Sequence, residues 1–138
     1  MIFPQPPLQE SPIAGSLPWV QWFSSVQKYF RIQSIQVPTL AANWSNYGGA
    51  YQTAGYWKDS ATGVVHLTGL VKKSVAGVAG EAIFTLPTGY RPAAQEIFAT
   101  DSNGAHSRID VNASGGVLFQ TGTATAWVSL SGISFKSV

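Results

Sequence analysis

Large apolar residues recur every three or four positions between residue 16 and about residue 33, which is the period of an amphipathic helix. Ser16 is placed to cap this helix at its N-terminus, and Pro38 prevents it from continuing. The pattern therefore predicts one short helix within a segment that spans residues 16–37. Its apolar stripe consists of Trp19, Trp22, Phe23, Val26, Tyr29 and Phe30.

This stripe has to be covered, because a short helix is only marginally stable on its own in water. Two interpretations remain open. Either the stripe packs on the rest of the same chain, or it forms a bundle seam with symmetry mates or docks on an attachment site. We favour the second interpretation, which makes the stripe a surface for attachment and oligomerisation.

Residues 1–15 hold four of the eight prolines of the chain. Proline fixes φ and has no amide N–H, so this arm is expected to be extended and to form no core of its own. Either the arm has no fixed structure, or it is ordered only against a partner protein. Together, the arm and the helix predict that residues 1–33 attach the chain to another protein.

From residue 38 to residue 138, short apolar runs alternate with turn-forming clusters at 59–63, 101–104 and 113–116. This mainly β pattern has no helix between its strands, which favours one antiparallel, jelly-roll-like β-sandwich domain. The strands are expected near residues 50–57, 64–73, 81–86, 94–100, 105–112, 116–121 and 126–135.

Residues 105–112 alternate cleanly and so predict which side chains are buried. One face carries Ser107, Ile109 and Val111. The opposite face is expected to be wet or interfacial, and it carries His106, Arg108, Asp110 and Asn112.

In residues 126–135 the apolar positions change parity near Gly132. A β-bulge there would keep both apolar sets in the core. The two sets are Val128 with Leu130 and Ile133 with Phe135.

Only 10% of the residues are charged, against about 25% in typical soluble proteins. So few charges suit subunits that bury part of their surface against copies of the same chain, which indicates an obligate oligomer. The net charge is +2, and the basic residues form no stripe for a phosphate backbone, which argues against nucleic-acid binding. The chain has no cysteine for disulfides or thiolate metal sites. Its apolar runs are too short for membrane insertion, and we expect no secretion signal.

Few residues are available for catalysis, because the chain has two histidines and six Asp and Glu residues. His106 and Asp110 are four residues apart, but on a strand this separates their Cα atoms by about 13 Å, too far for a catalytic dyad or a shared metal ion. His66 lies in an apolar run and is expected to be a hydrogen-bonded histidine of the core or of an interface. We therefore expect a protein that is not an enzyme and needs no cofactor.

Aromatic and amide side chains are concentrated between residues 43 and 52. Saccharide sites need flat rings that stack on the apolar faces of pyranoses, and amides that hydrogen-bond to hydroxyl groups. The alternative is that the rings of this region, Tyr56 and Trp57 in particular, fill the core or a trimer interface. The candidate glycan-binding residues are Asn43, Trp44, Asn46, Tyr47, Tyr51 and Gln52.

Several short motifs occur in a fixed order over residues 43–135. They lie at 47–59 (YGGAYQTAGYWKD), 63–71 (GVVHLTGLV), 83–92 (IFTLPTGYRP), 108–111 with 116–117, and 127–135 (WVSLSGISF). In these motifs the chain resembles the C-terminal domain of bacteriophage tail-fibre and receptor-binding proteins. The resemblance implies a homotrimeric β-sandwich at the end of a phage fibre that engages saccharide on the host surface. The shared motifs look structural, so no binding residue is carried over from the family.

The resemblance implies a structural protein of the phage virion, namely a tail fibre, knob or adaptor subunit that is made in the bacterial cytoplasm. Its partners would be further copies in a homotrimer, another virion protein bound through residues 1–33, and polysaccharide of the host surface. Two alternatives remain: a free bacterial carbohydrate-binding or adhesion module, and a head-fibre or decoration protein of the capsid.

Overall fold

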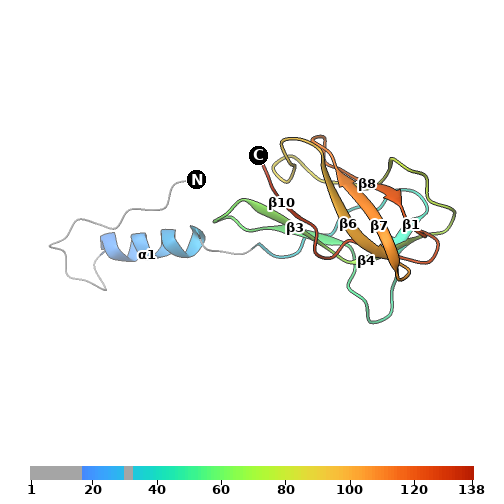
Figure 1. The fold of residues 1–138 in the computed structure, drawn as a ribbon. Coiled ribbons are helices and arrows are strands. Elements are labelled where there is room, and N and C mark those ends of the chain that lie inside the picture. Colours follow the sequence, from blue (N-terminus) through green and yellow to red (C-terminus); the bar gives the residue numbers. More distant parts are fainter. Residues whose placement is uncertain (1–16, 30–32) are drawn as a thin grey trace.

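The computed structural model describes residues 17–29 and 33–138 and is mainly β (Figure 1). In this part of the chain, helix α1 (Leu17–Tyr29) precedes ten strands. The strands are β1 (Trp44–Asn46), β2 (Gly55–Lys58), β3 (Val64–Thr68), β4 (Leu70–Lys73), β5 (Glu81–Thr85), β6 (Glu96–Ser102), β7 (Ala105–Val111), β8 (Gly116–Thr121), β9 (Val128–Ser129) and β10 (Ser134–Lys136).

The described strands form three antiparallel sheets in the orders β1-β4-β9, β10-β3-β2 and β5-β8-β7-β6. Their inward side chains make up one hydrophobic core. Burial of each large apolar side chain contributes about 1.5–3 kcal/mol to the free energy of unfolding. This sandwich-like arrangement confirms the predicted fold class. The largest fully buried side chains include Phe84, Leu67, Ile83, Leu86, Ile109, Leu130 and Ile133.

Two predicted strands are each divided between two sheets. Residues 64–73 form β3 and β4, which separate at Gly69, where φ is +114°. Residues 126–135 contain β9 and β10, which separate at a turn with Gly132, where φ is +92°. The prediction of a bulge at Gly132 is therefore wrong, because the chain turns there and passes from one sheet into another. The expected burial of both apolar sets is confirmed for Val128, Leu130, Ile133 and Phe135.

The two divisions lie side by side and are joined by hydrogen bonds. The amide of Leu67 donates to the carbonyl of Ile133 (2.9 Å), and the amide of Leu130 donates to the carbonyl of Gly69 (2.8 Å). The hydroxyl oxygen of Ser131 accepts a hydrogen bond from the amide of Gly69 (3.1 Å). The segments β3-β4 and β9-β10 therefore change sheets together, and we call this paired change of direction the sheet corner.

The region before β2 differs from the prediction. The sequence predicts a strand near residues 50–57, whereas β2 begins only at Gly55 and the residues before it form a loop. Gly48 and Gly49 have φ of +94° and +63°, values that end a strand. The short strand β1, which pairs with β4, was missed because this pairing joins residues far apart in the sequence.

In β7 the predicted inward face is confirmed, because Ser107, Ile109 and Val111 are fully buried. The outward face is only partly as predicted. His106 is exposed, but Asp110 is fully buried, and the expectation of a wet or interfacial position is wrong for this carboxylate within the single chain.

Helix α1 lies to one side of the β domain (Figure 1) and covers residues 17–29 of the predicted helical segment. Three rings of the predicted stripe contact one another. The ring centroids of Trp19 and Trp22 are 5.7 Å apart, and those of Trp22 and Phe23 are 5.1 Å apart. The stripe residue Val26 is half-buried.

Some predictions fall outside the described residues, namely the extended arm of residues 1–15, the cap at Ser16 and the stripe residue Phe30. Among the residues that the structure does describe, no helix combines the length and apolar character needed to cross a membrane.

Alanine at Gly69 should destabilise the protein far more than alanine at Gly132. Both glycines have positive φ, which costs another L-residue about 1–2 kcal/mol. A Cβ atom at Gly69 would also lie 2.5 Å from the Cα of Ala54 and 2.5 Å from the carbonyl oxygen of Thr53, whereas one at Gly132 would meet no atom within 4 Å. We expect Gly69→Ala to lose at least about 2 kcal/mol more of the free energy of unfolding. Urea unfolding measures both losses, and equal losses would show that the sheet corner tolerates a side chain.

Candidate functional site

The outer face of the sheet β1-β4-β9 and the end of β6 border a pocket of about 240 Å³, which we call the aromatic pocket. Two of its rings are accessible, with Tyr47 38% and Tyr51 60% exposed. Clefts for drug-sized ligands have about 300–1,000 Å³, so this pocket suits one compact group such as a single sugar residue. The lining residues are Tyr47, Tyr51, Leu70, Asp101, Trp127 and Ser129.

Backbone pairing positions the floor of the aromatic pocket. Leu70 on β4 is paired with Ser129 on β9, and the amide of Tyr47 donates to the carbonyl of Leu70 (2.9 Å). Their neighbours Val71 and Val128 are fully buried. Because side chains alternate across a strand, Leu70 and Ser129 face outward into the pocket.

One wall of the pocket is carried by the loop that follows β1. The amide of Tyr51 donates to the carbonyl of Gly48 (3.3 Å), which closes a turn. Asn46 holds the end of the loop, because its Oδ1 atom accepts a hydrogen bond from the amide of Ala54 (2.8 Å). The turn brings the rings of Tyr47 and Tyr51 to a centroid distance of 5.2 Å and an interplanar angle of 87°.

The opposite wall comes from the turn before β9. The amide of Trp127 donates to the carbonyl of Thr123 (3.2 Å), and the carbonyl of Trp127 accepts a hydrogen bond from the hydroxyl of Ser102 (2.8 Å). Ser102 directly follows Asp101 at the end of β6. These bonds therefore hold the backbone of Trp127 beside the end of β6, the strand that supplies the carboxylate.

The structure brings only part of the predicted glycan-binding set together. Tyr47 and Tyr51 line the pocket, and Asn46 supports the loop between them and β2. The side chains of Asn43 and Gln52 are exposed but do not line the pocket.

Trp44 cannot stack on a ligand, and its prediction as a glycan-binding residue is wrong. Its side chain is only 6% exposed, and its ring centroid lies 5.8 Å from that of Phe119 in the core. Trp44 points inward from β1, whereas the next residue, Ser45, is exposed. The alternative interpretation, that rings of this region fill the core, therefore applies to Trp44.

Four lining residues were missed because they meet the two tyrosines only through the tertiary fold. Asp101 lies in a predicted turn cluster and Trp127 begins one of the motifs that carry the family resemblance, but neither signal indicates that they approach residues 47–51. Leu70 and Ser129 carried no functional signal, since they read as ordinary strand residues.

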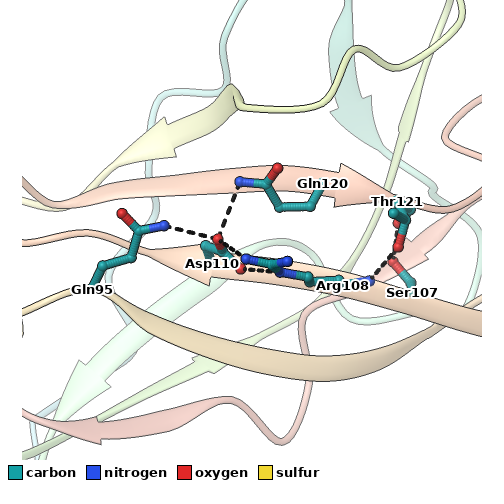
Figure 2. Close-up of polar contacts among 6 residues, drawn as sticks. All are labelled: Gln95, Ser107, Arg108, Asp110, Gln120 and Thr121. Atoms are coloured by element: carbon teal, nitrogen blue, oxygen red, sulfur yellow. Dashed lines mark hydrogen bonds and ion pairs between the residues drawn. The ribbon is translucent and has the colours of Figure 1, made fainter.

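A second group of polar side chains converges on the outward face of β7, around Asp110 (Figure 2). Its Oδ1 atom accepts a hydrogen bond from Nε of Arg108 (2.8 Å). Its Oδ2 atom accepts bonds from Nη2 of Arg108 (2.9 Å), Nε2 of Gln95 (2.8 Å) and Nε2 of Gln120 (3.2 Å). These three side chains cover the carboxylate, which explains why an outward position is fully buried.

This cluster stabilises the ionised carboxylate. Burial on its own would raise the pKa of Asp110, but the hydrogen bonds and charge of Arg108, together with the amides of Gln95 and Gln120, hold that pKa below its ordinary value. Both carboxylate oxygens are occupied by donors, and His106 is not among them. The contacts of Asp110 therefore indicate a structural role, in which the cluster stabilises the sheet.

The second histidine, His66, lies half-buried on the sheet β10-β3-β2. Its ring stacks on that of Trp57 with a centroid distance of 4.9 Å and an interplanar angle of 14°. Tyr56 packs against the core and against Tyr90 (5.2 Å). Within residues 17–29 and 33–138, no three His, Cys, Asp or Glu side chains lie close enough together to hold a metal ion.

Asp110→Asn should lower the free energy of unfolding at pH 7 by about 2–3 kcal/mol, because it leaves Arg108 without its charged partner. We expect less than for a fully buried pair, because the Arg108 side chain is 42% exposed. The folded-state pKa of Asp110 is lowered, so its contribution is present above about pH 4 and is lost as the pH falls towards that pKa.

Thermal unfolding between pH 7 and pH 2 tests this, and the difference between wild type and Asp110→Asn should shrink below about pH 4. The matched control is Asp101→Asn, an exposed carboxylate that should change stability by less than about 0.5 kcal/mol. A difference independent of pH would contradict the ionised carboxylate.

No family model matches the chain, and no curated protein matches its sequence. Among solved structures, the chain is similar to the crystal structure of the receptor binding protein (gp15) of Listeria phage PSA, with a TM-score of 0.68. The two are 16% identical, and the match covers 86% of this chain and 73% of that chain. The chain thus has the fold of a phage receptor binding protein.

Proposed function

We propose that this chain is a structural protein of a phage virion that binds saccharide on the host surface through the aromatic pocket. The observation that carries the proposal is that Tyr47, Tyr51, Trp127 and the carboxylate of Asp101 line one pocket. The fold that holds this pocket is similar to that of a phage receptor binding protein. Flat rings stack on the apolar faces of a sugar, and the carboxylate of Asp101 accepts hydrogen bonds from its hydroxyl groups.

The proposed role is binding without catalysis. Glycoside hydrolysis generally uses two carboxyl groups that flank the bond to be cleaved. Asp101 is the one carboxylate among the residues that line the pocket. The oxygens of Asp110 are occupied by Arg108 and two glutamine amides, which leaves them poorly suited to proton transfer.

The surface outside the aromatic pocket would serve assembly with further copies of the chain and with another virion protein. A homotrimer is supported by the low content of charged residues, 10%, and by exposed apolar side chains such as Ile97 (62% exposed) on the outer face of the four-stranded sheet. The aromatic stripe of α1 would then dock residues 1–33 on another virion protein. The chain would act on the particle surface as a tail-fibre, knob or adaptor subunit.

Trp127→Ala and Tyr51→Ala should each reduce binding of the purified protein to host cells and to their extracted surface polysaccharide. Loss of one stacking ring costs about 1–2 kcal/mol, which corresponds to a roughly fivefold to thirtyfold weaker affinity. His106→Ala is the matched control, because this exposed ring lies outside the pocket. Unchanged binding of both pocket variants, with folding intact, would refute the proposed site.

The assembly proposal is tested by light scattering of the full chain, which should give the mass of a trimer at micromolar concentration. A monomer would contradict it and favour a free bacterial adhesion module. A fragment of residues 38–138 should still unfold cooperatively, because the core is made of β-domain residues, but should fail to join particles.

Trp22→Ala should weaken incorporation of the full chain into particles, because it removes a large ring from the stripe of α1. Gln21→Ala, on an exposed position of the same helix, is the control and should leave incorporation unchanged. If both variants are incorporated like the wild type, the stripe is not the attachment surface.

A further inference from the structure

Three electron-rich aromatic side chains, those of Tyr47, Tyr51 and Trp127, line the aromatic pocket. Aromatic faces carry a negative electrostatic potential, which attracts cations within about 6 Å of the ring centroid. The rings of Tyr47 and Tyr51 pack edge to face, with a centroid distance of 5.2 Å and an interplanar angle of 87°, and Trp127 also lines the pocket. Aromatic residues from two separate segments of the chain therefore contribute to one pocket.

The one charged residue among those that line the pocket is Asp101. Its side chain is exposed and, within the described residues, receives no hydrogen bond or ion pair. Asp110 lies on the neighbouring strand, four residues from the partner of Asp101, and is in contrast fully supplied with donors. The free carboxylate therefore adds an unneutralised negative charge to the pocket, although the chain as a whole has a net charge of +2.

The chain already places one of its own ammonium groups on this aromatic surface. Nζ of Lys72 lies 5.5 Å from the centroid of the Tyr47 ring. Lys72 is not among the residues that line the pocket. The other titratable neighbour is His106, which is paired with Asp101 across β6 and β7.

From these charges we infer that the aromatic pocket binds an organic ammonium group. This inference rests on the proposed function and gives its ligand class. The volume of about 240 Å³ admits one ammonium group with the compact body that carries it. Two sources have this chemistry: a sugar with a free amino group, and a quaternary ammonium head group attached to a surface polysaccharide. Acidic sugars are disfavoured, because Asp101 would repel them.

Pairs of probes that differ in charge but little in shape distinguish this ligand class from sugars in general. We would titrate the full-length protein at pH 6 with glucosamine against glucose, and with choline against 3,3-dimethylbutan-1-ol. The readout is the nuclear magnetic resonance shift of the Trp127 indole N–H, assigned with a Trp127→Phe variant. Each ammonium probe should bind at least about fivefold more tightly than its neutral counterpart.

Three charge variants test the cause of that preference. Asp101→Asn should abolish most of the preference, whereas Glu96→Gln, an exposed carboxylate on the same strand but outside the pocket, should leave it unchanged. Lys72→Gln should tighten binding of both ammonium probes, because it removes a nearby positive charge. Opposite effects of the Asp101 and Lys72 variants are expected only if charge governs binding.

The outcomes separate this inference from the proposed function. Preference for glucosamine alone, or for choline alone, supports the inference and identifies the source of the ammonium group. Equal affinity for charged and neutral probes overturns the inference but leaves saccharide binding in place. If no probe shifts the Trp127 resonance, and host-cell binding survives Trp127→Ala, both the inference and the proposed site fail.

Discussion

Two segments that are far apart in the sequence pass from one sheet to another at the same point, and the outer face of the sheet β1-β4-β9 depends on how that crossing is held. The hydrogen bond from the Leu130 amide to the Gly69 carbonyl ties the two segments together at the sheet corner. Leu70 directly follows Gly69, and Ser129 directly precedes Leu130. Leu70 and Ser129, which lie next to the sheet corner, therefore form the floor of the aromatic pocket. The hydrogen bonds of the sheet corner thus position both the core strands and the floor of the site.

The alternation of apolar and polar residues within single segments was enough to predict which of their side chains are buried. The alternation in residues 105–111 predicted the buried face of β7, and the parity change near Gly132 predicted that both apolar sets reach the core. The parity change did not show how the backbone bends at Gly132. A bulge within one sheet and a turn between two sheets produce the same pattern of apolar residues. The pairing of β1 with β4 was beyond such patterns, since it joins distant residues.

In the candidate site, too, the sequence predicted residues that are close together in the chain but not those that only the fold brings together. Tyr47 and Tyr51 could be predicted from aromatic density, but Trp44 in the same stretch faces the core, because one position along a strand reverses the face. Asp101 and Asp110 lie on paired strands, and the sequence placed the first in a turn cluster and the second on a solvated strand face. Only the fold supplies glutamine and arginine donors to Asp110 and leaves Asp101 free beside Trp127.

The walls of the aromatic pocket are carried by turns, whereas its floor belongs to the packed sheet. Tyr51 is 60% exposed and is held by a turn at Gly48, so its replacement removes little buried surface. Changes at such positions usually alter stability by less than about 0.5 kcal/mol. Point mutations in these turns could therefore change the shape and chemistry of the pocket without passing through unstable intermediates. The division between floor and walls therefore lets the walls of the pocket vary in evolution independently of the folding stability of the domain.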